Sequence, residues 1–188
     1  MLHQLIREST KFQHADLEDL MYVEEIMNGS LGYEQYKHML ITNYLITAEY
    51  ETQLLQNLDS GIAMRLDVHK RIKIEALLKD IGEVNLDIND FKITTGFVTD
   101  SEHALGCLYV LEGATLGGNM IVKKLKENRH LKPYNLQFYY YQVYGEQLIS
   151  YWKQFCEVIN EQPEHNYSKI IEGAKFMYSE FMALQLAK

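Results

Sequence analysis

Apolar side chains recur every three or four residues along most of the chain, which predicts a protein built from α-helices. No segment shows the strict apolar–polar alternation of a half-buried β-strand. The pattern predicts six helical segments, at about residues 2–19, 33–57, 62–80, 99–128, 133–160 and 168–186, with an irregular stretch over about 83–98. We therefore expect an all-α fold, an irregular helical bundle forming a single domain over residues 1–188.

Turn and capping residues mark the ends of several segments. Polar, glycine-containing triplets at 28–30 and 59–61 predict loops on both sides of the second segment. Gly82 predicts a C-cap for the third. Residues 99–102, Thr-Asp-Ser-Glu, fit a capping box that begins the fourth helix at Thr99. Pro133 suits the first turn of the fifth.

Charge and cysteine content narrow the class of protein. The formal net charge of −8 disfavours nucleic-acid binding, which needs a basic surface. Two cysteines allow no dense disulfide framework and suit a reducing compartment. The N-terminus lacks the basic and apolar regions of a secretory signal, and no run of eighteen apolar residues occurs. These features predict a cytoplasmic protein with no membrane anchor.

The first segment carries a candidate metal ligand. Arg7, Lys11, His14 and Glu18 are spaced by four, three and four residues, which places them on one face of a single helix. Glu18 could accept a hydrogen bond from Nδ1 of His14 and leave Nε2 to bind iron. The two basic side chains could pair with carboxylates of a bound ligand. The same spacing also recurs by chance on solvated helix faces.

The remaining histidines and the cysteines suggest no second site. We interpret the other six histidines as surface or helix-end residues that form no zinc motif. The cysteines stand in apolar helical contexts and are interpreted as buried structural residues. These residues are His3, His38, His69, His103, His130 and His165, with Cys107 and Cys156.

Three glycines interrupt the fourth segment. Gly113, Gly117 and Gly118 lie in an otherwise good helix, where each costs roughly 1 kcal/mol relative to alanine. With Ala114 they remove side-chain bulk from one face, so that a flat, rigid ligand could approach the backbone. Close packing against another helix explains the pattern equally well. A phosphate-binding loop is poorly supported, because the Gly-Lys-Ser/Thr signature is missing.

Both segments resemble the haem oxygenase family. Residues 5–18 resemble its proximal helix, in which a histidine binds haem iron. Residues 108–118, Leu-Tyr-Val-Leu-Glu-Gly-Ala-Thr-Leu-Gly-Gly, resemble its distal helix, particularly in bacterial members. Residues 36–51 and 170–181 resemble its second and last helices. The resemblance implies a helical fold that binds haem between the first and fourth helices, with haem as both substrate and cofactor.

The resemblance also implies roles for individual residues. His14 would hold the iron and Glu18 would orient it. Arg7, Lys11 and, in a looser alignment, Lys153 would contact the haem propionates. The distal segment formed by Gly113, Ala114, Gly117 and Gly118 would cover the opposite face of the haem. Ala114 departs from the family, in which aspartate or serine stands there, and its methyl group cannot hydrogen-bond.

The reaction implied by the family is cleavage of haem by O₂ and reducing equivalents to biliverdin, CO and ferrous iron. No Gly-x-Gly-x-x-Gly fingerprint is present, so electrons would come from an external donor such as a ferredoxin or a reductase. Because of Ala114, a haem carrier or sensor on the same fold is an alternative. Thiaminase-like or di-iron enzymes are a further one, but paired Glu-x-x-His motifs are missing. The donor, the ring-opening isomer and the biological role are left open.

Overall fold

The structure, a computed structural model, describes residues 1–88 and 96–185. Within these residues it contains α-helices and short 3-10 helices (η) but no β-strand, which confirms the predicted all-α fold. In chain order the elements are α1 Leu2–Ser9, α2 Lys11–Leu20, α3 Val23–Asn28, α4 Tyr33–Asn57, α5 Ser60–Leu66, η1 Val68–Lys70, α6 Ile74–Glu83, α7 Ser101–Leu116, α8 Gly118–Glu127, η2 Lys132–Tyr134, η3 Tyr140–Gln142, η4 Gly145–Gln147, α9 Leu148–Asn160, η5 Glu164–Asn166 and α10 Tyr167–Gln185.

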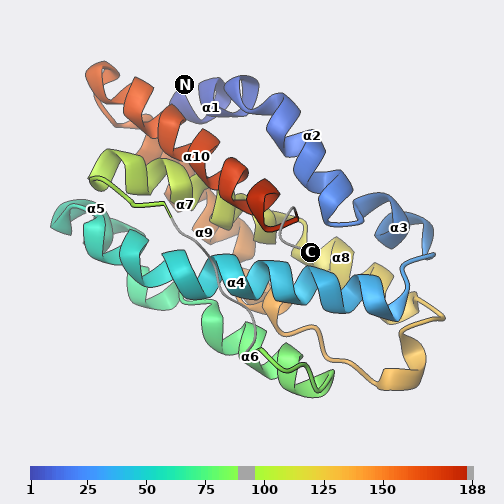
Figure 1. Ribbon diagram of the computed structural model, residues 1–188. Helices are drawn as coiled ribbons and strands as arrows, with labels where there is room; N and C mark the ends of the chain where they lie inside the picture. The colour runs from blue at the N-terminus through green and yellow to red at the C-terminus, as the bar shows by residue number, and fades with distance from the viewer. Residues whose placement is uncertain (89–95, 186–188) are drawn as a thin grey trace.

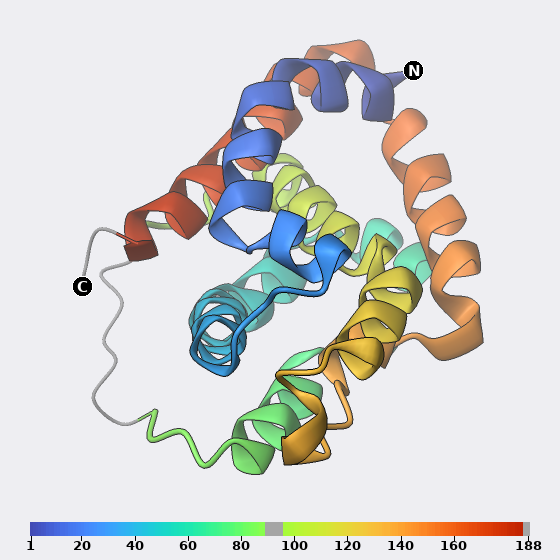
Figure 2. The same ribbon diagram turned by 90° about the vertical axis from the view of Figure 1, so that its right-hand side faces the viewer.

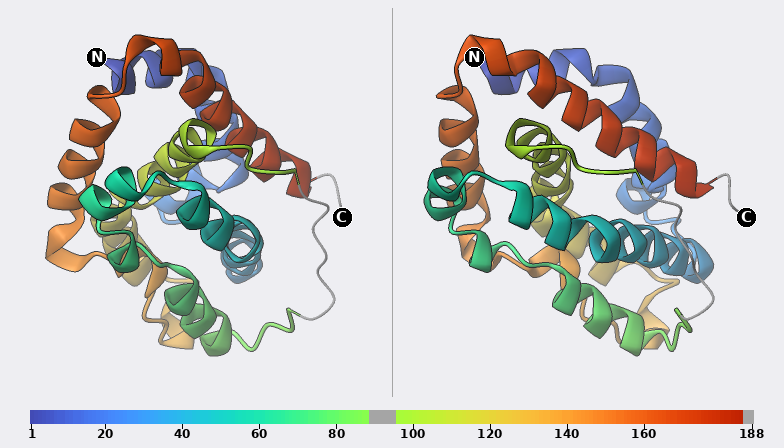
Figure 3. Two further views of the ribbon diagram at one scale, coloured as in Figure 1. Left: turned by 90° about the vertical axis from the view of Figure 1, so that its left-hand side faces the viewer. Right: turned by 60° about the vertical axis from the view of Figure 1, so that its left-hand side comes forward.

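Helix α7 runs through the middle of the molecule. Figure 2 and Figure 3 show it from opposite sides, with the other helices arranged around it. Ten consecutive residues of α7, 103–112, are buried. Its most extensive packing is against α10, which crosses it as shown in Figure 1. A methyl group at Gly106 would overlap the carbonyl oxygen of Ile170, and one at Gly173 would overlap that of His103. The two glycines therefore let the helix backbones touch.

The long helix α4 joins two hydrophobic cores. Its C-terminal half contributes Ile46, Tyr50 and Leu54 to a core shared with α1, α7, α9 and α10. Its N-terminal half contributes Tyr36 and Met39 to a core shared with α3, α6, α8 and η3. Burial of apolar surface on both halves stabilises this helix, although its sequence lacks a simple one-sided apolar stripe. The predicted bounds 33–57 are confirmed, as is a last helix close to 168–186.

The first predicted helix is in fact two helices, because the chain breaks at Thr10. The Thr10 side chain is buried, and its hydroxyl donates to the carbonyl oxygen of Ile6 at 2.8 Å. Such a bond from a side chain to the preceding turn competes with regular helix geometry. Arg7 therefore belongs to α1, whereas Lys11, His14 and Glu18 belong to α2. The expectation that all four lie on one continuous helix is wrong.

The third predicted helix is also divided. Asp67 takes a left-handed conformation, with φ of 50°, and ends α5. A 3-10 turn and a short linker lead to α6. Gly82 is an internal residue of this helix, and Val84 is its C-cap. The prediction of Gly82 as C-cap is therefore wrong. The short α3 was not predicted, and within the irregular stretch 83–98 residues 89–95 lie outside the described part of the chain.

The fourth predicted helix starts one residue later than its capping box suggests, and it bends. Asp100, rather than Thr99, is the N-cap, and its carboxylate accepts the backbone N–H of His103 at 3.1 Å. The helix breaks at Gly117 into α7 and α8. No single helix in the described residues is long and apolar enough to cross a membrane; α7 and α8 reach that length only together, across a bend of 40°.

The fifth predicted helix begins fifteen residues later than expected, at Leu148 instead of Pro133. Pro133 lies in the 3-10 helix η2. Asn135, Phe138 and Gly145 then take positive φ values of 51°, 62° and 50°, which a continuous right-handed helix cannot contain. The Asp80 carboxylate holds this segment through the backbone N–H groups of Tyr139 and Tyr140, at 2.7 and 2.8 Å.

We predict that Gly173→Ala destabilises the protein by about 2–3 kcal/mol or more, because the added methyl forces α7 and α10 apart. Gly82→Ala is the matched control. A methyl there meets nothing within 4 Å, so the variant should be neutral or stabilised by up to about 1 kcal/mol. Urea unfolding followed by circular dichroism measures both. Equal stability of the two variants would contradict the tight crossing.

A second prediction concerns the cap of α7. The Lys169 ammonium hydrogen-bonds the Asp100 carboxylate at 2.6 Å and lowers its pKa from 3.8 to about 2. Since the folded-state pKa is depressed, the carboxylate stabilises the fold above about pH 4, and this contribution is lost as the pH falls towards 2. Asp100→Asn should therefore cost about 1 kcal/mol at pH 7 and progressively less below pH 4. Exposed Asp16→Asn should show no such pH-dependent difference in urea unfolding.

Candidate functional site

The His14 side chain projects from α2 and is 59% exposed. Its Nδ1 atom lies 3.5 Å from a carboxylate oxygen of Glu18, one helical turn later. This distance is long for a hydrogen bond, but it places the carboxylate beside Nδ1 rather than Nε2. Helix α2 packs mainly on α10 and α3. The imidazole is exposed to solvent with a carboxylate beside Nδ1, an arrangement compatible with a ligand at Nε2.

Tyr178 of α10 packs against this histidine. Its ring contacts the His14 ring edge to face, with centroids 6.4 Å apart. Burial raises the pKa of Tyr178 to about 12, while a hydrogen bond with the Thr10 side chain acts in the opposite direction. The Tyr178 hydroxyl therefore stays protonated. It ties α10 to the break between α1 and α2.

Tyr109 of α7 lies on the other side of the same region. Its hydroxyl donates to the carbonyl oxygen of His3 at 3.4 Å. Burial raises the pKa of Tyr109; the charge of Arg7 acts in the opposite direction. The hydrogen bond of Tyr109 connects the central helix with α1.

Gly113 follows Tyr109 by one helical turn and shares its face of α7. A methyl group at Gly113 would meet nothing within 4 Å, and one at Gly117 would meet only the Ile121 side chain, 3.4 Å away. At Gly118 a methyl would overlap the carbonyl oxygen of Tyr141. The two explanations for the glycines therefore apply to different residues: Gly118 permits close packing against η3, whereas Gly113 leaves an accessible backbone.

Three exposed cations belong to the elements around this region: Arg7 on α1, Lys11 on α2 and Lys153 on α9. Within the described residues none of them forms an ion pair. Lys153 follows Trp152 on α9, and the Trp152 ring lies 5.6 Å from the Tyr109 ring between centroids. Figure 2 shows α1 and α2, α8 and α9 surrounding the exposed end of α7. These unpaired cations suit a ligand that carries carboxylates.

Ala114 is half-buried next to Gly113, and its methyl group offers no hydrogen bond. The nearest side-chain hydroxyl in the same helical turn belongs to Thr115. It is buried and donates to the carbonyl oxygen of Glu112 at 2.9 Å. Polar contacts to a ligand at this turn are therefore left to the backbone.

Sequence reasoning missed Tyr109 and Tyr178. The position of Tyr109, four residues before Gly113, was a usable signal, whereas Tyr178 meets His14 only through the fold. His103 was interpreted as a surface or helix-end residue; it lies in the first turn of α7, but it is buried, with 7% exposed, and its Nδ1 lies 4.0 Å from Sγ of Cys107. Burial lowers the pKa of His103.

In the described residues no three His, Cys, Asp or Glu side chains converge to hold a metal ion.

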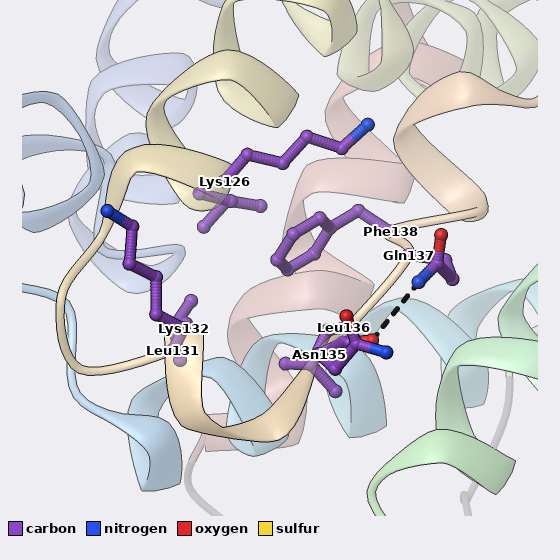
Figure 4. A pocket seen from close by; sticks show the side chains of 8 residues that line it. Lys126, Leu131, Lys132, Asn135, Leu136, Gln137 and Phe138 are labelled. Carbon is purple, nitrogen blue, oxygen red and sulfur yellow. Dashed lines mark hydrogen bonds between the residues drawn. The ribbon is translucent and has the colours of Figure 1, made fainter.

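A separate surface pocket lies at the far end of α8. It measures about 280 Å³ and is lined by Leu125, Lys126, Leu131, Lys132, Asn135, Leu136, Gln137 and Phe138. Figure 4 shows Lys126 and Lys132 at its edges and the Gln137 side chain hydrogen-bonded to the carbonyl oxygen of Asn135, at 3.1 Å. None of the residues predicted for function lines this pocket.

Comparison with known proteins identifies the family and the fold. The sequence matches the family described as "Heme oxygenase" over residues 1–186. The fold is similar to the NO- and CO-bound haem oxygenase from Neisseria meningitidis, with a TM-score of 0.73 and 15% sequence identity over 97% of this chain and 89% of that one. No curated protein sequence matches the chain.

Proposed function

Starting from the fact that the chain belongs to the haem oxygenase family, whose activity is haem degradation, we propose that it cleaves haem between α2 and α7 with His14 as the iron ligand. The products would be biliverdin, CO and ferrous iron. One observation carries the proposal. An exposed imidazole with a carboxylate beside it lies on α2, and an accessible glycine backbone lies on the central helix α7. Helix α10 packs against both helices, and its Tyr178 contacts the imidazole.

The residues present fit a haem. His14 would offer one ring nitrogen to the iron, and the porphyrin would bring its own ligands, so no cluster of protein ligands is needed. Glu18 beside Nδ1 favours the tautomer in which Nε2 binds iron and strengthens it as a ligand. Arg7, Lys11 and Lys153 would pair with the two propionates and so set the orientation of the substrate in its plane.

The distal segment would act through its backbone and its shape. Gly113 and Gly117 present no side chain, so the helix can lie close to the substrate and restrict where O₂ reaches the ring. Backbone groups at the bend and ordered water would supply hydrogen bonds, since Ala114 offers none. Gly118 acts indirectly, by seating the start of α8 on η3. Electrons would come from a separate donor protein, a ferredoxin or a reductase, and the reaction would take place in the cytoplasm.

A second candidate function, a haem carrier or sensor, is favoured by Ala114. In the family pattern a hydrogen-bonding side chain stands at this position and could help deliver protons. Without it the chain could bind haem reversibly and leave the ring intact. The two functions share the His14 ligand and the propionate contacts, so they differ only in the fate of the haem ring after reduction in air.

We predict that the purified protein binds haemin and that the complex shows a Soret absorption band. On addition of a reductant in air, the protein should convert the haemin to a bilin with release of CO and ferrous iron. His14→Ala should lose the histidine-ligated spectrum and turnover while keeping the helical circular dichroism signal, because the side chain is exposed. His69→Ala removes an exposed histidine on η1 and should behave as wild type. Absorption spectroscopy with product analysis measures both steps.

The same assay separates the two candidates. Intact haem after prolonged reduction in air would support the carrier and contradict catalysis. A spectrum that is unchanged in His14→Ala would remove His14 from the site. Ala114→Ser adds a hydroxyl at the position that departs from the family pattern, and it should raise the rate of ring opening if a missing proton donor limits that step.

A further prediction concerns the cations. Lys11→Met and Lys153→Met should each weaken haemin binding by about two- to fivefold, the effect expected for one exposed ion pair. The loss should shrink in high salt, because screening weakens the wild-type contact. Lys70→Met, which removes an exposed lysine paired with Asp67 on η1, is the control and should leave affinity unchanged. Haemin titration at low and high ionic strength tests this; equal affinities throughout would exclude these lysines from the site.

A further inference from the structure

A fully buried charge cluster lies directly behind the distal segment. Arg71, Lys73 and Glu112 are each no more than 2% exposed, and Tyr144 is 7% exposed. We refer to these four residues as the Glu112 cluster. Arg71 and Lys73 come from the linker between α5 and α6, Glu112 from α7, and Tyr144 from the segment between η3 and η4. Sequence patterns did not indicate it, because its members are 32 to 41 residues apart from Glu112.

The carboxylate of Glu112 is held from three directions. One oxygen accepts a hydrogen bond from Nζ of Lys73 at 2.6 Å and one from the hydroxyl of Tyr144 at 2.7 Å. The other oxygen pairs with the Arg71 guanidinium. Burial alone would raise the pKa of Glu112, but Lys73 and Arg71 outweigh this effect and hold the pKa below its usual value. Glu112 is therefore an ion with both carboxylate oxygens engaged.

Arg71 also connects the Glu112 cluster with α9, the helix that carries Lys153. Its guanidinium also donates to the carbonyl oxygen of Tyr151 at 3.2 Å and to the side-chain oxygen of Gln154 at 3.0 Å, both on α9. In the sequence, Lys153 lies between Tyr151 and Gln154. The Arg71 guanidinium also donates, through Nε, to the carbonyl oxygen of Leu66 at 2.7 Å. One guanidinium thus links α5, α7 and α9.

Glu112 lies one residue before Gly113, and its backbone is restrained as well. The Thr115 hydroxyl donates to its carbonyl oxygen, within the turn that contains Gly113 and Ala114. Gly113 itself has no side chain that could pack and hold it in place, and it faces open space. The bonds of Glu112 are therefore the side-chain hydrogen bonds nearest to Gly113 on its N-terminal side, and they restrain the start of this turn.

Stability alone does not require ions here. Well-packed apolar groups of similar volume often stabilise a core as well as a buried ion pair does. What an ion network adds is direction, since each hydrogen bond restricts distance and angle. A rotation or shift of the turn would bend these hydrogen bonds away from their preferred angles, a restriction that apolar contacts do not impose.

We propose that Glu112 is a positioning residue, which through Arg71, Lys73 and Tyr144 holds the Gly113 turn at a defined height over the substrate and so sets which edge of the porphyrin is opened. This inference rests on the proposed function. Glu112 does not touch the substrate; it acts through the backbone of Gly113.

The test uses three variants of the full chain. Glu112→Gln keeps the size of the side chain but removes the charge. Lys73→Met/Glu112→Gln removes one charge of each sign and so leaves the net charge of the cluster unchanged. It serves in case the single variant folds poorly. Leu31→Ala truncates a buried side chain outside α7, α9 and the 71–73 linker, and serves as a control that lowers global stability.

The first readout is hydrogen exchange of the protein without haem. Amides at 113–118 should exchange at least about tenfold faster in both Glu112 variants, relative to the slowest amides of α10, because the turn opens locally. In Leu31→Ala all amides should accelerate together. Uniform acceleration in all three variants would mean that the cluster only stabilises the fold, and would overturn the proposal.

The second readout is the bilin isomer composition after single turnover with haemin, reductant and air. The Glu112 variants should give a broader isomer mixture than wild type and Leu31→Ala, with a shifted spectrum of the haemin complex. An unchanged composition in the Glu112 variants would overturn the inference while leaving the proposed function intact. A wild-type protein that binds no haemin would instead overturn the proposed function.

Discussion

The direct contact between the backbones of α7 and α10 is the constraint on which the rest of the molecule depends. Gly106 and Gly173 remove the side chains that would keep these helices apart, so that carbonyl groups of each helix touch the other. The crossing also fixes the position of Tyr178 on α10 relative to the central helix. Since Tyr178 also contacts His14, the position of the candidate iron ligand follows from how closely α10 approaches the central helix.

Glycines in the central helix and in its continuation α8 serve two different purposes. Gly106 and Gly118 lie where another backbone occupies the space that a side chain would need. Gly113 lies where nothing does. Close packing can offset the free energy lost by placing glycine in a helix, because neighbouring atoms replace water. At Gly113 no such contact exists, and the open face is the part of α7 that remains available to a ligand.

Family membership and chemistry rest on different observations. The match over residues 1–186 and the shared fold at 15% identity establish the architecture and the family. The proposed chemistry depends on a few side chains: an imidazole with a carboxylate behind it, exposed cations, and a glycine turn anchored by a buried ion cluster. The Ala114 side chain offers no hydrogen bond, so under the proposed function backbone groups would supply the polar contacts at this turn. Whether these contacts suffice for ring opening separates the two candidate functions.

Local patterns in the sequence predicted the features that depend on neighbouring residues. Helix α4 and the last helix were predicted closely, because apolar spacing and flanking turn residues are local signals. His14 with Glu18, and the glycines after Tyr109, were visible for the same reason. The break at Thr10, the late start of α9 and the split between packed and open glycines depend on contacts with distant segments. The Glu112 cluster joins residues from three parts of the chain, and no local pattern records which buried charge meets which. The sequence alone thus determined the all-α class, helix α4, the last helix and the candidate ligand. Only the tertiary structure decided where the other helices break and what surrounds the candidate ligand, since burial and pairing are properties of the folded chain.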